Sequence, residues 1–211
     1  HVTVVEYVSG IPLSRLLDAV HGQPCSRVRD VFARMDADIA TSFDDGYRRD
    51  ESASCIVSSR ERFNNFCWRV VLRMANAVDY SHSQDIVHHD IKPENILIGF
   101  CGTPKLIDFG VGCTGAHDSQ TGGTLSYLPE RELQRLAGLE GELSSAESGD
   151  SCGVFADLYA LGVVLYEVTV GDLPYRPVSA EHSIVAAARQ ALPGRHDLAA
   201  SVRSNSRIEP G

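Results

Sequence analysis

The strongest hydrophobic pattern in the chain begins at Phe63 and repeats at steps of three and four residues. Such steps place side chains on one face of an α-helix, so the pattern predicts a long amphipathic helix ending near His82. Just before it, Ser58 and Glu61 have the spacing of a capping box, whose side chains satisfy the first backbone N–H groups of a helix. The stripe that we expect to be core comprises Phe63, Phe66, Val70, Met74, Ala77, Val78 and Ser81.

Shorter patterns predict further elements on both sides of this helix. The chain opens on a strand-like run at 2–7, and residues 13–20 carry apolar side chains on one helical face, which predicts a short helix. Two apolar runs, 96–98 and 105–107, flank the glycine- and proline-containing segment 99–104. That arrangement is typical of a β-hairpin.

Two more helices are predicted in the second half of the chain. Residues 155–170 are apolar on nearly every face and are followed by Gly171, as expected for a helix buried in the middle of a domain. Residues 179–192 have an amphipathic pattern that Pro193 and Gly194 end. Together the elements predict an α+β fold that is mainly helical and contains one small hairpin.

Three segments lack such patterns. Residues 25–57 are polar and weakly periodic, so we expect an exposed insertion there, with a shorter one near 137–153. Residues 197–211 show no hydrophobic periodicity, so we expect a polar tail there. A hydrophobic content of 43% in 211 residues fits one globular domain. Because the sequence opens with His1 on a strand-like run, we expect an upstream part of the protein to be missing.

The net charge of −9 and the isoelectric point near 5.3 argue against nucleic acid as a partner, since phosphate backbones require clustered basic residues. The six cysteines form no C-x-x-C pair, which favours reduced thiols and argues against a zinc site. The apolar stretch 154–170 is interrupted by Asp157 and Glu167, so we expect it to fall short of a membrane span. Without a secretory leader, these features predict a cytoplasmic location.

The candidate catalytic residues belong to the run His88-His89-Asp90-Ile91-Lys92-Pro93-Glu94-Asn95-Ile96-Leu97. A second run, Asp108-Phe109-Gly110, starts thirteen positions after Asn95. These two runs, with the predicted hairpin between them, resemble the catalytic loop H-R-D-x-K-P-x-N and the D-F-G motif of protein kinases. The chain therefore resembles the C-terminal lobe of a eukaryotic-type serine/threonine protein kinase. An isolated Asp or Asn beside a turn is usually a cap, but this ordered set favours catalysis.

The resemblance assigns a role to each of these residues. Asp90 would orient the acceptor hydroxyl and take its proton, which typically contributes roughly 100- to 10,000-fold in rate. Lys92 would neutralise the transferred phosphoryl group, while Asn95 and Asp108 would provide oxygen ligands for Mg²⁺ bound to ATP. Thr124 matches the threonine that contacts the catalytic Asp and Lys in serine/threonine kinases, so a protein Ser or Thr is the implied acceptor.

Other segments extend the resemblance. Leu128-Pro129-Glu130 occupies the position of the A-P-E motif, and Gly171-Asp172-Leu173-Pro174-Tyr175 resembles the G-x-x-P-F turn. Asp157-Leu158-Tyr159-Ala160-Leu161-Gly162 resembles the D-x-W-S-x-G motif, whose Asp bonds the catalytic-loop backbone. Residues 5–8 resemble the hinge, which implies that backbone groups of Glu6 and Val8 bind adenine and that Leu97 packs beneath it.

The chain also departs from the family pattern. No motif corresponds to the glycine-rich loop, the strand lysine or the partner glutamate of the N-terminal lobe, so we expect this piece alone to be inactive. The closing helices, with the arginine that pairs with Glu130, are not seen. His89 replaces the arginine that grips a phosphorylated activation loop, and Pro12 stands where many kinases have a polar residue for ribose.

Alternative functions remain open from the sequence. A pseudokinase that serves only as a binding module would share the fold, and an aminoglycoside-type phosphotransferase would share H-x-D-x-x-x-x-N and the later Asp. The G-x-G-x-x-G match at 110–115 lacks a following helix, which argues against a dinucleotide fold. The pair His88-His89 lacks metal-ligand spacing, and we expect His88 to be a packing residue.

Overall fold

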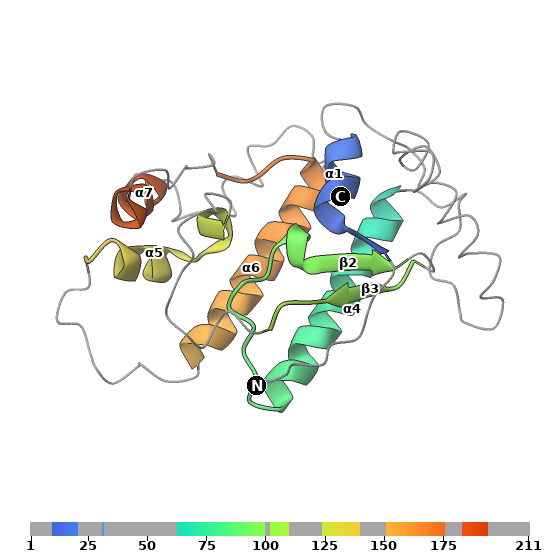
Figure 1. Ribbon diagram of the computed structural model, residues 1–211, viewed down its shortest axis with the longest axis horizontal. Coiled ribbons are helices and arrows are strands. Elements are labelled where there is room, and N and C mark those ends of the chain that lie inside the picture. The colour runs from blue at the N-terminus through green and yellow to red at the C-terminus, as the bar shows by residue number, and fades with distance from the viewer. Residues whose placement is uncertain are drawn as a thin grey trace, which may run out of the picture. The chain divides into compact units, whose positions relative to one another are not determined.

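The computed structural model describes residues 10–20, 31, 63–99, 102–109, 124–139, 151–175 and 183–193. Its elements are β1 (Gly10–Pro12), α1 (Leu13–Val20), α4 (Phe63–Ser83), the 3-10 turn η1 (Pro93–Asn95), β2 (Ile96–Gly99), β3 (Pro104–Leu106), the 3-10 turn η2 (Thr124–Tyr127), α5 (Glu130–Leu136), α6 (Ser151–Val170) and α7 (Ile184–Ala191). Figure 1 labels the five helices and the strands β2 and β3 and colours them from blue to red along the chain.

The chain divides into two compact units. The first comprises residues 1–74 and 93–107, and the second comprises residues 75–92 and 108–211. The boundary lies within α4, between Met74 and Ala75. The sheet and α1 therefore belong to the first unit, whereas α5, α6 and α7 belong to the second.

Helix α4 confirms the prediction from the hydrophobic stripe. It begins at Phe63 and ends at Ser83, and every stripe residue except Ala77 is buried. The backbone leaves the helix through a turn in which Ile86 N donates to the carbonyl of Ser81 over 2.9 Å. Asp85 takes a left-handed backbone conformation there, with φ of 58°, as residues just past a helix end often do. The proposed capping box at Ser58 lies outside the described residues.

The predicted hairpin is present, but it is part of a larger sheet. Strands β2 and β3 pair antiparallel, with Leu97 opposite Lys105, and β1 adds an antiparallel third strand on the other edge of β2. β1 was not expected, because Gly10-Ile11-Pro12 is only three residues long and ends in proline. Gly10 is required at this place, since a Cβ there would collide with the carbonyl of Ile98.

Helix α6 begins earlier than predicted and is less evenly buried. It spans Ser151–Val170, and its part Gly153–Val170 is long and apolar enough to cross a bilayer by length and composition alone. The expectation that this stretch is too short is therefore wrong. Half of the stretch is buried inside the protein, as in many core helices, although Phe155 and Leu158 are exposed. Gly171 ends the helix with φ of 79°, as predicted.

Helix α7 begins later than predicted. Ser183 is extended, with φ of −164°, and its hydroxyl caps the helix by accepting from Ala186 N over 3.4 Å. The prediction of one continuous helix over residues 179–192 is therefore wrong at Ser183, which is not helical. Residues 176–182 lie outside the described part of the chain. The sequence pattern also gave no sign of α5, because Leu128-Pro129-Glu130 was interpreted only as a motif.

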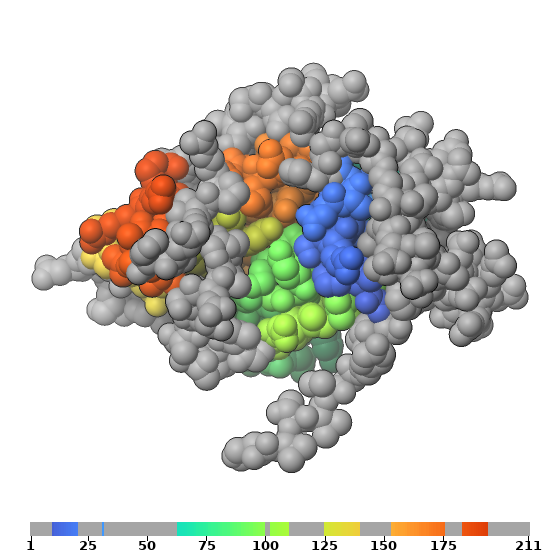
Figure 2. Space-filling view, turned by 45° about the horizontal axis from the view of Figure 1, so that its top comes forward, coloured from blue at the N-terminus to red at the C-terminus, as the bar shows by residue number. Residues whose placement is uncertain are grey.

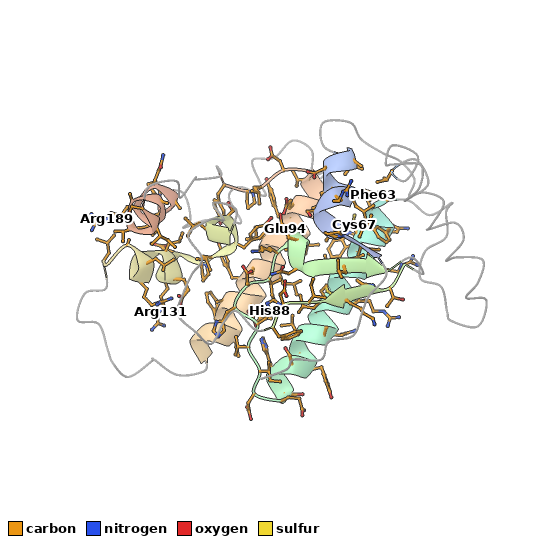
Figure 3. All side chains as sticks on the ribbon, in the orientation of Figure 1. Phe63, Cys67, His88, Glu94, Arg131 and Arg189 are labelled. Carbon is orange, nitrogen blue, oxygen red and sulfur yellow. The ribbon has the colours of Figure 1, made fainter. Side chains whose placement is uncertain are left out.

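Helices α5 and α7 and the turn η2 share one hydrophobic cluster in the second unit. Figures 1 and 2 show α7 lying against α5. Arg189, labelled in Figure 3, extends from α7 and donates from Nε to the carbonyl of Ala137, at the C-terminal end of α5, over 3.2 Å. The buried members of the cluster are Leu125, Leu133, Ala137, Ala187, Ala188 and Ala191.

The segment 25–57 was predicted to be exposed, and the structure describes only Val31 within it. Val31 is helical and fully buried, so the prediction is wrong at this position. The rest of that segment, the segment 140–150 within the second predicted insertion, and the tail 197–211 lie outside the described residues. The opening run 2–7 lies outside them too.

The cluster of α5 and α7 provides a test of the packing. Leu133→Ala should lower the free energy of unfolding by about 2 to 5 kcal/mol, because Leu133 is fully buried in this cluster. Urea unfolding followed by circular dichroism measures the loss. Leu139→Ala is the matched control, since 51% of Leu139 is exposed. Equal losses for the two variants would contradict the packing of α5.

Candidate functional site

The segment after α4 is held by one buried carboxylate. Asp157, on the second turn of α6, is 1% exposed. Its Oδ2 accepts a hydrogen bond from the backbone N–H of His88, and its Oδ1 accepts one from that of His89, each over 2.8 Å. A buried carboxylate requires such donors to offset the loss of water. The bond from Asp157 to the catalytic-loop backbone, expected from the D-x-W-S-x-G resemblance, is therefore confirmed.

The backbone of this loop is strained at His89. Its φ is 65°, in the left-handed region that a side chain with a Cβ seldom adopts. Asp108 has φ of 64° and shares this property. Such conformations persist only where surrounding bonds hold them, and they cluster at functional sites. At His89 the bond to Asp157 supplies this support.

The side chain of His88 links the loop to the D-F-G segment. His88 is fully buried, and its ring meets the ring of Phe109 edge to face, with centroids 4.6 Å apart. The expectation that His88 is a packing residue is thus confirmed. His88, labelled in Figure 3, also accepts a hydrogen bond at Nδ1 from the backbone N–H of Asp90 over 3.2 Å. The residue therefore packs and also fixes the backbone of Asp90.

Asp90 and Lys92 form an ion pair at the end of this loop. The Nζ of Lys92 lies 2.8 Å from Oδ2 of Asp90, with the two side chains 13% and 17% exposed, respectively. A carboxylate in this position can accept a proton, and the ammonium can compensate negative charge on a neighbouring group. Both residues were predicted catalytic residues, and the structure brings them together.

The predicted magnesium ligands belong to different units. Asn95 is buried in η1 of the first unit, and its carbonyl accepts a hydrogen bond from Ile107 N over 2.9 Å. Asp108, the residue that follows Ile107, is exposed and belongs to the second unit. That the side chains of Asn95 and Asp108 bind the same ion therefore remains a prediction. Within the described ranges, no group of three His, Cys, Asp or Glu residues could hold a metal ion.

The structure describes some of the remaining predicted site residues and not others. Leu97 lies on β2 and is partly exposed, in a register that pairs it with Pro12. Thr124 begins η2, but nothing is described of its side chain. Glu6 and Val8 lie outside the described residues. Glu130, predicted to lack its arginine partner, accepts a hydrogen bond from Gln134 over 2.9 Å within α5.

Two residues near the loop were missed by the sequence analysis. His82, at the end of α4, donates from Nε2 to Oδ2 of Asp157 over 2.9 Å. Gly153 lies so close to the loop that a Cβ would stand 2.7 Å from Cε1 of His89. The pairing of His82 with Asp157 joins residues 75 positions apart, and neither hydrophobic periodicity nor local spacing reports such a contact.

Comparison with known proteins adds independent evidence. A family model described as the protein kinase domain matches residues 48–208. The chain is 40% identical over 110 residues to the serine/threonine-protein kinase TOS3 of Saccharomyces cerevisiae, covering 51% of this chain and 20% of that protein. It is 41% identical over 114 residues to an Aurora kinase of Eremothecium gossypii, covering 53% and 27%, respectively. It is 38% identical over 121 residues to a probable serine/threonine-protein kinase PknB of Bifidobacterium longum, covering 54% and 16%.

These matches concern only a part of each relative. The chain spans about a fifth of TOS3 and about a quarter of the Aurora kinase. The matched residues 48–208 include the loop at His88, the ion pair and Asp157. They exclude Glu6 and Val8, so the hinge assignment receives no support from the family match.

The buried carboxylate provides a test of the loop geometry. Asp157→Asn should lower the free energy of unfolding by about 1 to 3 kcal/mol, because an amide NH₂ would face a backbone N–H group in a buried place. Urea unfolding of the chain measures the loss. Asp79→Asn on the exposed face of α4 is the matched control and should change stability little. The same small change in both variants would argue against Asp157 as the support of the loop.

Proposed function

Because this chain belongs to the protein kinase domain family, we propose that it is the catalytic region of a serine/threonine protein kinase that transfers the γ-phosphate of ATP to protein Ser or Thr hydroxyls. The observation that carries the proposal is the ion pair of Asp90 and Lys92 at 2.8 Å, on a loop whose backbone Asp157 holds. This arrangement provides a base and a positive charge side by side, which phosphoryl transfer requires.

The reaction follows from these positions. The acceptor hydroxyl oxygen forms a bond to the γ-phosphorus while the bond from that phosphorus to the β,γ-bridging oxygen breaks. Asp90 orients the hydroxyl and takes its proton, and Lys92 compensates charge on the transferred phosphoryl oxygens. The electron pair of the broken bond leaves with ADP. The protein contributes orientation and electrostatic stabilisation, and forms no covalent intermediate.

Asn95 and Asp108 are the residues that would hold Mg²⁺ with ATP. An amide and a carboxylate oxygen suit this ion, which keeps several waters and takes further ligands from substrate phosphates. The exposed carboxylate of Asp108 is consistent with this fit. Bound Mg²⁺ would neutralise phosphate charge.

We further propose that the chain corresponds to the C-terminal lobe and hinge of such a kinase, with residues 25–57 as an insertion. The three-stranded sheet and the helices fit this assignment, and the motif order supports it. A cytoplasmic location belongs to the same proposal, because the six cysteines of the sequence show no C-x-x-C spacing and a domain of this size does not require disulfides.

Activity of the complete reading frame tests the proposal. With labelled ATP and a general protein substrate, Asp90→Asn and Lys92→Met should each lower kcat by about 100-fold or more, because each removes one partner of the ion pair. Asp79→Asn, which alters an exposed acid on α4, should retain activity.

Other outcomes identify the rival functions. Nucleotide binding without transfer to protein, or no nucleotide binding at all, would favour a pseudokinase that acts as a binding module. Transfer to an aminoglycoside but to no protein would favour a small-molecule phosphotransferase. Either result would overturn the assignment as a protein kinase.

The 211-residue chain by itself should show no phosphotransfer. Its sequence has no motif that corresponds to the glycine-rich loop and strand lysine with which kinases hold the ATP phosphates. The check is incubation of the purified chain with labelled ATP, Mg²⁺ and protein substrate. Strong label transfer that Asp108→Asn abolishes would contradict this prediction.

A further inference from the structure

The first turn of α6 lies against the catalytic loop at a glycine. Gly153 is partly buried, and a Cβ at this residue would point at two side chains of the loop. It would stand 2.9 Å from Cγ1 of Val87, 2.7 Å from Cε1 of His89 and 3.4 Å from Nε2 of His89. Carbon atoms in favourable contact lie about 3.5 to 4.0 Å apart. The loop is therefore as close to α6 as only a residue without a side chain allows.

This close approach matters for the hydrogen bonds one turn further along α6. Gly153 and Asp157 are four positions apart, so they lie on the same face of the helix. Asp157 accepts from the backbone N–H groups of His88 and His89, each over 2.8 Å. Hydrogen bonds of this kind span about 2.7 to 3.2 Å, so a shift of the loop by roughly 0.5 Å away from α6 would weaken both.

A side chain at residue 153 would move the backbone of the loop and not only its side chains. The exposed ring of His89 can turn away from α6 into solvent. Val87 cannot yield in this way, because a β-branched side chain is stiff about χ1 and its Cγ1 is only one bond from Cβ. The loop at Val87 would therefore have to withdraw as a whole, and the neighbouring N–H groups would withdraw with it.

We propose that Gly153 is a positioning residue of the kinase reaction: through Val87 and His89 it sets the distance between the loop and α6, and thereby the place of Asp90. Asp90 follows His89 directly in the chain, and its N–H donates to Nδ1 of His88 over 3.2 Å. A displacement of about 1 Å at a reacting group can cost roughly 100-fold in rate. This inference rests on the proposed function only for its consequence on activity.

Two glycines of α6 provide a matched pair of variants. Gly153→Ala adds the Cβ that would meet the loop, whereas no atom of the described residues lies within 4 Å of a Cβ at Gly162. Both changes introduce a better helix former, so Gly162→Ala controls for helix propensity. A double variant, Val87→Ala with His89→Asn, removes the three loop atoms that the new Cβ would meet. Asparagine is chosen because it tolerates the left-handed backbone of His89.

The first readout is amide hydrogen exchange in the 211-residue chain, followed by NMR. The amides of residues 88 and 89 should exchange about 10-fold faster or more in Gly153→Ala, but within about 3-fold of the unaltered rate in Gly162→Ala. The amide of Val164, inside α6, should be unaffected, which separates a local shift from global destabilisation. If Gly153→Ala does not fold, recovery of folding in the double variant, measured by circular dichroism, supports the inference, and failure there overturns it.

The second readout is kinetics in the complete reading frame. Gly153→Ala should lower kcat about 10- to 100-fold with little change of KM for ATP, but less than about 3-fold when it is added to the double variant. The inference is overturned if Gly153→Ala and Gly162→Ala exchange alike, or if Gly153→Ala costs the same factor in both backgrounds. If the unaltered protein transfers no phosphate, the proposed function fails, and the exchange data alone still decide whether Gly153 sets the position of the loop.

Discussion

The geometry of the candidate site depends on the buried carboxylate of Asp157. A charge at 1% exposure would be strongly unfavourable by itself, yet here two backbone N–H groups and one imidazole bind it. The same bonds stabilise the loop, whose residue His89 has a left-handed backbone. The carboxylate and the loop therefore depend on each other. Without the loop the carboxylate would lose two of these three donors, and without the carboxylate the backbone N–H groups of His88 and His89 would lose this acceptor.

This mutual dependence relates the helices to the chemistry. Helix α6 carries Asp157 into the interior, and the end of α4 brings His82 to it. The loop between them presents Asp90 and Lys92 as a close ion pair. The packing of His88 against Phe109 connects the loop to the segment that begins with Asp108. The apolar helices thus support a few polar groups, and the positions of such groups determine how fast an enzyme can catalyse its reaction.

The sequence predicted what local patterns determine. The stripe from Phe63 predicted α4 because each turn of the helix contributes to the same pattern, and the runs beside Asn95 predicted β2 and β3. Strand β1 was missed because three residues ending in proline acquire strand geometry only by pairing with β2. The start of α7 at Ile184 depends on the cap formed by Ser183, whereas the sequence offers Ser179 as a second candidate.

The site was predicted as far as its motifs extend. The ordered residues from Asp90 to Asp108 indicated the phosphoryl transfer that we propose, and the resemblance at Asp157 predicted its bond to the loop. The contribution of His82 could not be predicted, since it arises from two helices that meet only in the folded chain. The joint position of Asn95 and Asp108 and the contacts of Glu6, Val8 and Thr124 stay predictions.

The most direct test of the account is a crystal structure of the complete protein with Mg²⁺ and a non-hydrolysable ATP analogue. The account predicts that oxygens of Asn95 and Asp108 bind the metal at the phosphates while Asp90 and Lys92 face the γ-phosphate from the loop held by Asp157. A structure in which these side chains face no common nucleotide would contradict it.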